Sequence, residues 1–190
     1  MNMGTKDVLK YLFELGQMRR VKHGGWTLVG IEQPDSIAEH SLRAAQIGYV
    51  LAVMEKYEKP EEVCSMLVFH DAHETRIGDL HKVARRYVTA EDEKAAEEQV
   101  AELGEIGERI MALWSTIEHK DPPAGIIAKD ADYLETAVTA KEYLDNGYPL
   151  VQDWIDNVGS ALKTESAKKL WAELKDATAH DWWKGLKKLA

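Results

Sequence analysis

Residues 63–79 constrain the fold most, because an apolar run, residues 63–69, ends directly in His70 and Asp71. Pro60 precedes the run, and proline is favoured at the first position of a helix. A helix that is apolar on nearly every face must be buried. Its end then places nitrogen and oxygen donors on a packed scaffold, as a divalent-metal site requires. We therefore expect a central buried helix whose neighbours supply the remaining ligands of such a site.

Composition limits the broad class of the protein. The chain has 190 residues, of which 45% are hydrophobic and 30% charged, so one domain over residues 1–190 with its own core is expected. The net charge of −9 and the scattered basic residues argue against nucleic acid as a partner. No apolar run approaches the roughly 18–20 residues of a membrane span, so no membrane partner is expected. A single cysteine, Cys64, and the lack of a leader-like start favour the cytoplasm.

Helical periodicity recurs along the chain, and glycine or proline separates the periodic segments. Ser36 and Glu39 match the capping box, which predicts a helix that begins just before His40. Further helices are expected over residues 7–17, over residues 91–118 with a break near Gly104 and Gly107, and from residue 121 to residue 147. These patterns predict an all-α, single-domain helical bundle.

Two of the predicted helices carry candidate ligands toward the core. His40 shares a helix face with apolar residues, where a lone histidine is also compatible with a hydrogen-bonded core residue. Asp130 and Asp132 interrupt the apolar surface of the helix over residues 121–147. Asp132 lies on an apolar stripe and is expected to point inward. Asp130, displaced by about 200°, is expected to face solvent or a supporting partner.

The candidate ligands form a set of mixed donors. Nitrogen and carboxylate donors together suit manganese, cobalt, iron or zinc better than calcium. The predicted ligands of this divalent transition metal are His40, His70, Asp71 and Asp132.

The order of these residues resembles that of the HD-domain metal-dependent phosphohydrolases, in which a helix-borne His is followed by His-Asp and a distant Asp. The fuller set is similar to the 5'-deoxynucleotidase branch of that superfamily. It consists of Gly25-Trp26, Glu39-His40-Ser41, residues 70–74, Gly78-Asp79 and residues 129–132. The resemblance covers about residues 8–146 and leaves residues 149–190 as additional C-terminal helices. It implies a bundle of the HD-domain type, a small nucleotide substrate and a homodimer.

The resemblance also implies roles for individual residues. His40, His70, Asp71 and Asp132 would bind the cation. Glu74 would act in catalysis, Asp79 would act there or contact the substrate or a second cation, and Trp26 would bind the nucleotide. Bacterial members carry an arginine just before the tryptophan, where this chain has Gly25, so another basic residue must orient the phosphate. The candidates for this role are Arg19, Arg20, Lys22, His23 and Lys82.

The expected activity is removal of the 5'-phosphate from (deoxy)nucleoside monophosphates by a metal-activated water. An alternative is hydrolysis of nucleoside triphosphates or another phosphoester. A further alternative is a non-catalytic, metal-binding regulatory protein in which Glu74 is only a capping or surface acid. His73 is not favoured as a ligand, and His180-Asp181 lacks a preceding apolar run, so no second site is expected there.

Overall fold

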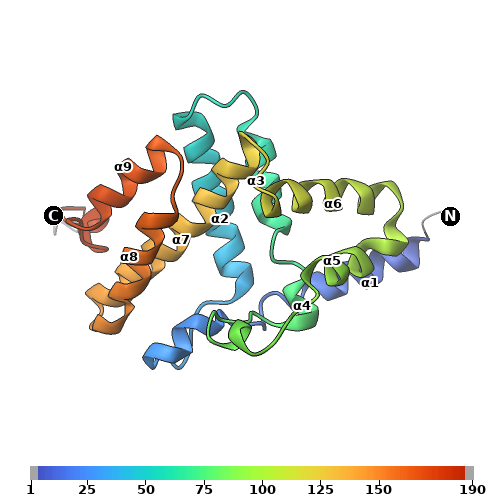
Figure 1. Cartoon of the computed structure of the whole chain (residues 1–190), viewed down its shortest axis with the longest axis horizontal. Helices are drawn as coiled ribbons and strands as arrows, with labels where there is room; N and C mark the ends of the chain where they lie inside the picture. The colour runs from blue at the N-terminus through green and yellow to red at the C-terminus, as the bar shows by residue number, and fades with distance from the viewer. Residues whose placement is uncertain (1–3, 187–190) are drawn as a thin grey trace.

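The computed structural model describes residues 4–186, and this part of the chain is predominantly helical (Figure 1). Its α-helices are α1 (Thr5–Leu15), α2 (Ile37–Met54), α3 (Pro60–Phe69), α4 (Glu74–Ile77), α5 (Asp92–Val100), α6 (Glu105–Glu118), α7 (Ala124–Asp145), α8 (Gln152–Ala161) and α9 (Glu165–Leu174). Short 3-10 helices are η1 (Gly24–Val29), η2 (Ala84–Arg86), η3 (Ala101–Leu103), η4 (Pro149–Val151) and η5 (Asp181–Trp183). The predicted all-α class is confirmed. None of the helices within residues 4–186 combines the length and the apolar composition needed to traverse a bilayer.

Local signals in the sequence set several helix ends. At the start of α2, Ser36 Oγ accepts the backbone N–H of Glu39 at 3.3 Å, and Glu39 Oε2 accepts the backbone N–H of Ser36 at 2.7 Å. Helix α3 begins at Pro60. Gly104, at φ 53°, separates η3 from α6, because its positive φ is readily available only to glycine. The predicted capping box and the predicted break are therefore confirmed.

Helices α2, α3 and α7 contact one another at the centre of the molecule. The largest core cluster draws on all three, with buried Leu51, Leu67 and Leu134 among its members. Gly48 permits the close approach of α2 to α3, since a Cβ at this position would lie 2.3 Å from Leu67 Cδ1. This contact sets how far His40 on α2 lies from His70 at the end of α3.

Helices α8 and α9 cover one side of α7, whereas α1, α5 and α6 lie at the other end of the molecule (Figure 1). Helix α7 is therefore enclosed along much of its length and exposes few of its residues. Asp130 lies on the side that faces α9. Of the two alternatives expected for Asp130, solvent or a supporting partner, exposure to solvent is wrong, because only 1% of this residue is exposed.

Asp130 joins α7 to the segment that precedes α9. Its carboxylate accepts the backbone N–H of Lys163 at 2.9 and 3.0 Å and the backbone N–H of Thr164 at 2.6 Å. Backbone N–H groups just before a helix need acceptors, and a buried carboxylate needs donors, so each satisfies the other.

Replacing Asp130 with alanine is expected to lower the free energy of unfolding by about 3 kcal/mol, because the substitution leaves buried backbone donors unpaired. Chemical denaturation followed by circular dichroism measures this change. Asp156→Ala is the matched control, since Asp156 is exposed on α8 and accepts only from Gln152. Equal stability of the two variants would contradict the role assigned to Asp130.

Candidate metal centre and adjoining cavity

Three helical regions deliver the predicted ligands to one place. His40 lies in the first turn of α2, His70 directly follows α3, and Asp132 lies within α7. One ligand atom from each of these residues lies within 4.8 Å of the others. Asp71 belongs to the turn after His70, where the backbone leaves the helix axis. The fold thus gathers side chains that are up to 92 positions apart in the sequence.

Both aspartates face the same pair of imidazole nitrogens. His40 Nε2 lies 3.1 Å from Asp132 Oδ1 and 3.5 Å from Asp71 Oδ2. His70 Nε2 lies 3.0 Å from Asp71 Oδ2 and 3.8 Å from Asp132 Oδ1. The second oxygen of Asp132 is 2.9 Å from Lys129 Nζ, so this aspartate is held on one side and free to coordinate on the other. The structure therefore brings all four predicted ligands together.

The histidine rings are oriented by contacts on their opposite edges. His40 Nδ1 lies 2.5 Å from Glu135 Oε2, and His70 Nδ1 donates to the carbonyl oxygen of Leu67 at 2.8 Å. Such contacts to the outer nitrogen are typical of metal-binding histidines and leave Nε2 available for the ion. His70 Nε2 is buried and, despite its closeness to Asp71, has no partner in hydrogen-bond geometry among residues 4–186. A buried nitrogen without a partner and a mixed donor set fit a divalent transition cation.

The electrostatics of the cluster also favour a cation. Burial by itself would lower the pKa of His70, but the charge of Asp71 and the contact with Asp132 outweigh burial and raise the pKa to about 10. The pKa of His40 is likewise raised, since its contacts with Asp132 and Glu135 outweigh its burial. The excess of negative charge therefore attracts positive charge, and a metal ion would compete with protons for the same nitrogens.

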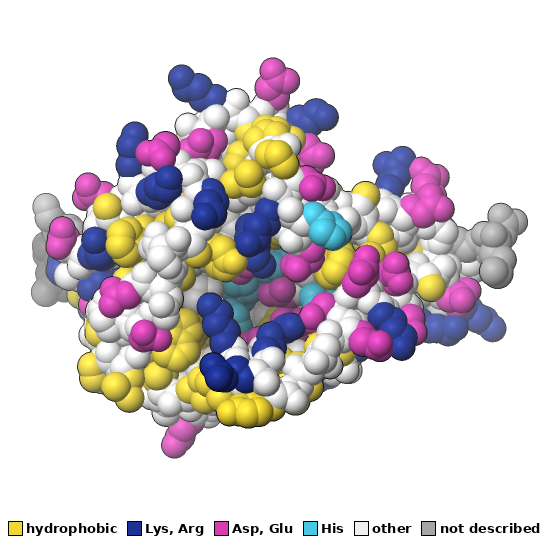
Figure 2. Space-filling model, in the orientation of Figure 1, with side chains coloured by type: hydrophobic (Ala, Val, Ile, Leu, Met, Phe, Trp, Pro, Cys, Tyr) yellow, Lys and Arg dark blue, Asp and Glu magenta, His cyan; other side chains and the backbone are white. Residues whose placement is uncertain are grey.

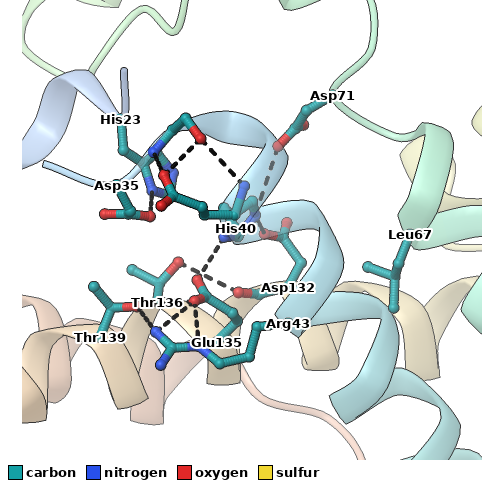
Figure 3. A network of polar contacts seen from close by, with 12 residues as sticks. His23, Asp35, His40, Arg43, Leu67, Asp71, Asp132, Glu135, Thr136 and Thr139 are labelled. Carbon is teal, nitrogen blue, oxygen red and sulfur yellow. Dashed lines mark hydrogen bonds and ion pairs between the residues drawn. The ribbon is translucent and has the colours of Figure 1, made fainter. Parts of the chain in front are cut away.

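A polar network behind His40 was not foreseen from the sequence (Figure 3). Arg43 Nε donates to Glu135 Oε1 at 2.9 Å, and Arg43 also donates to Thr139 and, at 2.7 Å, to Glu142. Thr139 Oγ1 donates to Glu135 Oε1 at 2.8 Å. The sequence contains a spacing that could have indicated this network. Arg43 follows His40 by three positions, and Glu135 follows Asp132 by three. Residues three apart share a helix face, so the two pairs oppose each other when α2 packs against α7.

Glu74 and Asp79, the predicted catalytic acids, lie beside this centre. Glu74 is buried at the start of α4, and its Oε2 atom has no hydrogen-bond partner among the described residues. Burial, together with the charges of Asp71 and Asp79, raises the pKa of Glu74 to about 9. Asp79 Oδ2 accepts the backbone N–H of Gly24 at 2.6 Å and so ties the start of η1 to the segment after α4.

A cavity of about 350 Å³ adjoins Asp132. Its lining includes Lys82, one of the predicted phosphate-orienting residues. Figure 2 shows a hollow with histidine and acidic side chains on its floor and lysine and arginine side chains around its rim. Trp26 does not line the cavity, because it is packed into the core with 2% of its surface exposed. Arg19 is exposed in the turn after α1 and is also absent from the lining. Their contacts with substrate stay predictions.

Two other histidine-containing motifs lie apart from the cluster. His73 is buried, but its Nδ1 faces the carbonyl oxygen of His70 at 3.1 Å and its Nε2 lies 3.5 Å from Asp92. In the His180-Asp181 pair, Asp181 accepts the backbone N–H of Thr178 at 3.0 Å and stabilises a surface turn. Neither histidine belongs to the group that could hold an ion within residues 4–186.

Comparison with known proteins places the chain in a family. Residues 15–175 match the model of the HD domain, so the match extends through α8 and α9. The protein belongs to the HD domain family. A genomics crystal structure with 33% sequence identity superimposes with a TM-score of 0.80 and covers 94% of this chain and 99% of its own. A predicted metal-dependent phosphohydrolase from Magnetospirillum magnetotacticum, 19% identical, has the same fold, with a TM-score of 0.68 and 90% of each chain covered.

Curated relatives of this HD-domain protein include several named 5'-deoxynucleotidase. The protein 5'-deoxynucleotidase HDDC2 of Bos taurus is 24% identical over 177 residues, which are 90% of this chain and 85% of the relative. Its counterpart in Danio rerio is 29% identical over 142 residues, which are 72% of this chain and 70% of the relative. The 5'-deoxynucleotidase of Erwinia tasmaniensis is 27% identical over 136 residues, which are 64% of this chain and 68% of the relative.

The contact between Glu135 and His40 predicts an effect on metal affinity. Glu135→Gln is expected to weaken binding of Mn²⁺ or Co²⁺ by about 10- to 100-fold, since a neutral amide holds the imidazole less firmly and makes it less basic. Isothermal titration calorimetry measures the affinity. Glu142→Gln is the control, because Glu142 also contacts Arg43 but makes no hydrogen bond to His40 among the described residues. Unchanged affinity in Glu135→Gln would contradict this role.

Proposed function

We propose that this HD-domain protein hydrolyses the 5'-phosphate ester of deoxynucleoside monophosphates with a divalent transition metal. Manganese, cobalt, iron and zinc all suit the donor set of His40, His70, Asp71 and Asp132. The observation that carries the proposal is that these four residues meet beside buried Glu74, at a cavity lined by a cationic side chain. The curated relatives named 5'-deoxynucleotidase support the choice of substrate.

The residues around the centre have complementary tasks in such a reaction. A bound divalent cation would supply Lewis acidity toward a phosphoryl oxygen and a water molecule. Lys82 lines the cavity together with Asp132, where its ammonium group attracts the phosphate. Glu74 is buried beside the centre, where its carboxyl group can donate a proton to the leaving sugar oxygen. In its ionised form the same carboxylate can accept a proton from the attacking water. Asp79, fixed by Gly24, is available to contact the sugar.

Further parts of the proposal concern the context of the enzyme. The whole chain, residues 1–190, forms one HD domain of a cytoplasmic homodimer. Apolar side chains exposed on one stripe of α2 support self-association, as does the exposed Trp182. The stripe consists of Leu42, Tyr49, Val50 and Val53. Arg19 is retained as a substrate-binding residue, and the predicted role of buried Trp26 in nucleotide binding would be exerted through Trp154, against which it packs.

A panel of deoxynucleoside and ribonucleoside 5'-monophosphates tests the proposal. With Mn²⁺ or Co²⁺ the purified protein is expected to release orthophosphate, and faster from the deoxy forms. Removal of the metal with a chelator is expected to abolish release, because the carboxylates and imidazoles cannot replace the Lewis acid. A malachite green assay measures orthophosphate. If no monophosphate yields orthophosphate, the proposal is wrong. Release of pyrophosphate or tripolyphosphate from nucleoside triphosphates would instead support the alternative of a triphosphate hydrolase.

Glu74→Gln separates catalysis from metal binding. The substitution keeps the size of the side chain but removes its titratable proton, so kcat is expected to fall about 10²- to 10⁴-fold. Calorimetry should show that the metal still binds. Glu93→Gln, at an exposed position of α5, is the control. Undiminished turnover in Glu74→Gln would favour the non-catalytic reading, in which Glu74 is a structural acid.

A further inference from the structure

The cavity beside the metal centre continues well past the ligands. From Asp132 it follows α7 past Tyr133 and Thr136, the latter one helical turn further along. It then reaches α8, which contributes Trp154, Val158 and other residues to the lining. Phosphate hydrolysis alone requires only the end near Asp132. The α8 end is therefore available to the remainder of the substrate.

Helix α8 presents one face to this cavity. Trp154, Val158 and Ala161 lie at positions i, i+4 and i+7, a spacing that places side chains on the same side of a helix. Leu28 of η1 adds another apolar side chain to the lining. Helix α8 also contributes two exposed polar residues to the lining. Asn157 Nδ2 donates a hydrogen bond to Asp153 Oδ2 at 3.0 Å. The α8 end thus offers an apolar, partly aromatic wall with a polar, solvent-exposed edge.

Trp154 and Tyr133 are the aromatic residues of the cavity lining, and Trp154 is the one at the α8 end. It is half-buried, and its indole is backed by Trp26 with ring centroids 5.4 Å apart and planes inclined by 36°. Trp26 in turn packs edge-on against Tyr143 with centroids 5.3 Å apart. The Trp154 ring is therefore held in place before any ligand arrives, which reduces the entropy lost on binding.

Gly25 leaves the Trp154 ring uncovered. A Cβ at this position would lie 3.6 Å from Trp154 Nε1 and 3.7 Å from Cζ2, in van der Waals contact with the indole. A longer side chain at residue 25 would extend over or beside the ring. The absence of a side chain at Gly25 therefore leaves space beside the Trp154 ring.

We infer that the α8 end of the cavity binds the nucleobase, with Trp154 as the stacking platform. This inference rests on the proposed function, because it assumes that the phosphate lies beside Asp132. Stacking suits every base, since each has a π-face, so the site selects nucleotides over simpler phosphomonoesters and tolerates different bases. Trp26 acts through Trp154 as a positioning residue in this arrangement.

The test compares 2'-deoxyadenosine 5'-monophosphate with 2-deoxyribose 5-phosphate, which lacks the base. In Trp154→Ala, the ratio of kcat/KM for the nucleotide to kcat/KM for the sugar phosphate is expected to fall about tenfold. Trp154→Phe keeps an aromatic ring and should retain most of the ratio. Phe13→Ala is the control, because Phe13 is 70% exposed on α1 and is absent from the cavity lining.

A second variant covers the possibility that Trp154→Ala fails to fold. Ala161→Met narrows the cavity from α8 without removing a core side chain, and it should lower the same ratio. Thermal unfolding verifies that each variant is folded. Calorimetric binding of 2'-deoxyadenosine, which has no phosphate to hydrolyse, gives a readout independent of activity and should weaken about tenfold in Trp154→Ala.

The outcomes separate this inference from the proposed function. Hydrolysis of the nucleotide with an unchanged ratio in both folded variants would overturn the inference and leave the proposed function intact. Absence of hydrolysis in the parent protein, with deoxyadenosine binding that depends on Trp154, would overturn the proposed function and support the base site. Deoxyadenosine binding that is equal in the parent and Trp154→Ala would overturn the inference in either case.

Discussion

The buried contact between α2 and α7 is the interaction on which the candidate site depends. His40 and Arg43 project from α2, and Asp132 and Glu135 project from α7 to meet them. Buried charges are unfavourable unless they are paired and hydrogen-bonded, so this contact restricts the two helices to one relative position. Because His40 and Asp132 belong to the same contact, the arrangement that satisfies the buried charges also orients two candidate ligands.

Around this rigid pair the remaining functional groups come from shorter elements. His70 and Asp71 follow the end of α3, and Glu74 begins the short α4. Asp79 anchors η1 through Gly24, so the turn-rich segments on either side of the centre are joined to each other. Helix α8 then closes the cavity from the far side of α7. The candidate metal centre thus lies on packed helices, whereas the adjoining cavity is lined by loop residues together with α7 and α8.

Asp130 and Asp132 illustrate how far periodicity alone can be trusted. The pattern correctly separated the two carboxylates by about 200° around α7 and directed Asp132 toward the metal centre. Of the two alternatives for Asp130, solvent or a supporting partner, the first is wrong because the opposite side of the helix does not face water. Helix α7 is covered by α2 and α3 on one side and by α8 and α9 on another, so its second acid is buried as well and satisfies backbone donors before α9.

The sequence by itself determined the local features and pointed to the candidate donors that the fold brings together. The capping box at Ser36, proline at the start of α3 and the glycine break at residue 104 depend on neighbouring residues, so short-range sterics and hydrogen bonds are sufficient to predict them. Only the tertiary structure decided that Glu135 supports His40, that Asp130 anchors α9 and that Trp154 stands uncovered in front of Trp26. Those contacts join residues separated by 33 to 128 positions, and they arise from how helices cross and pack, which no local pattern specifies.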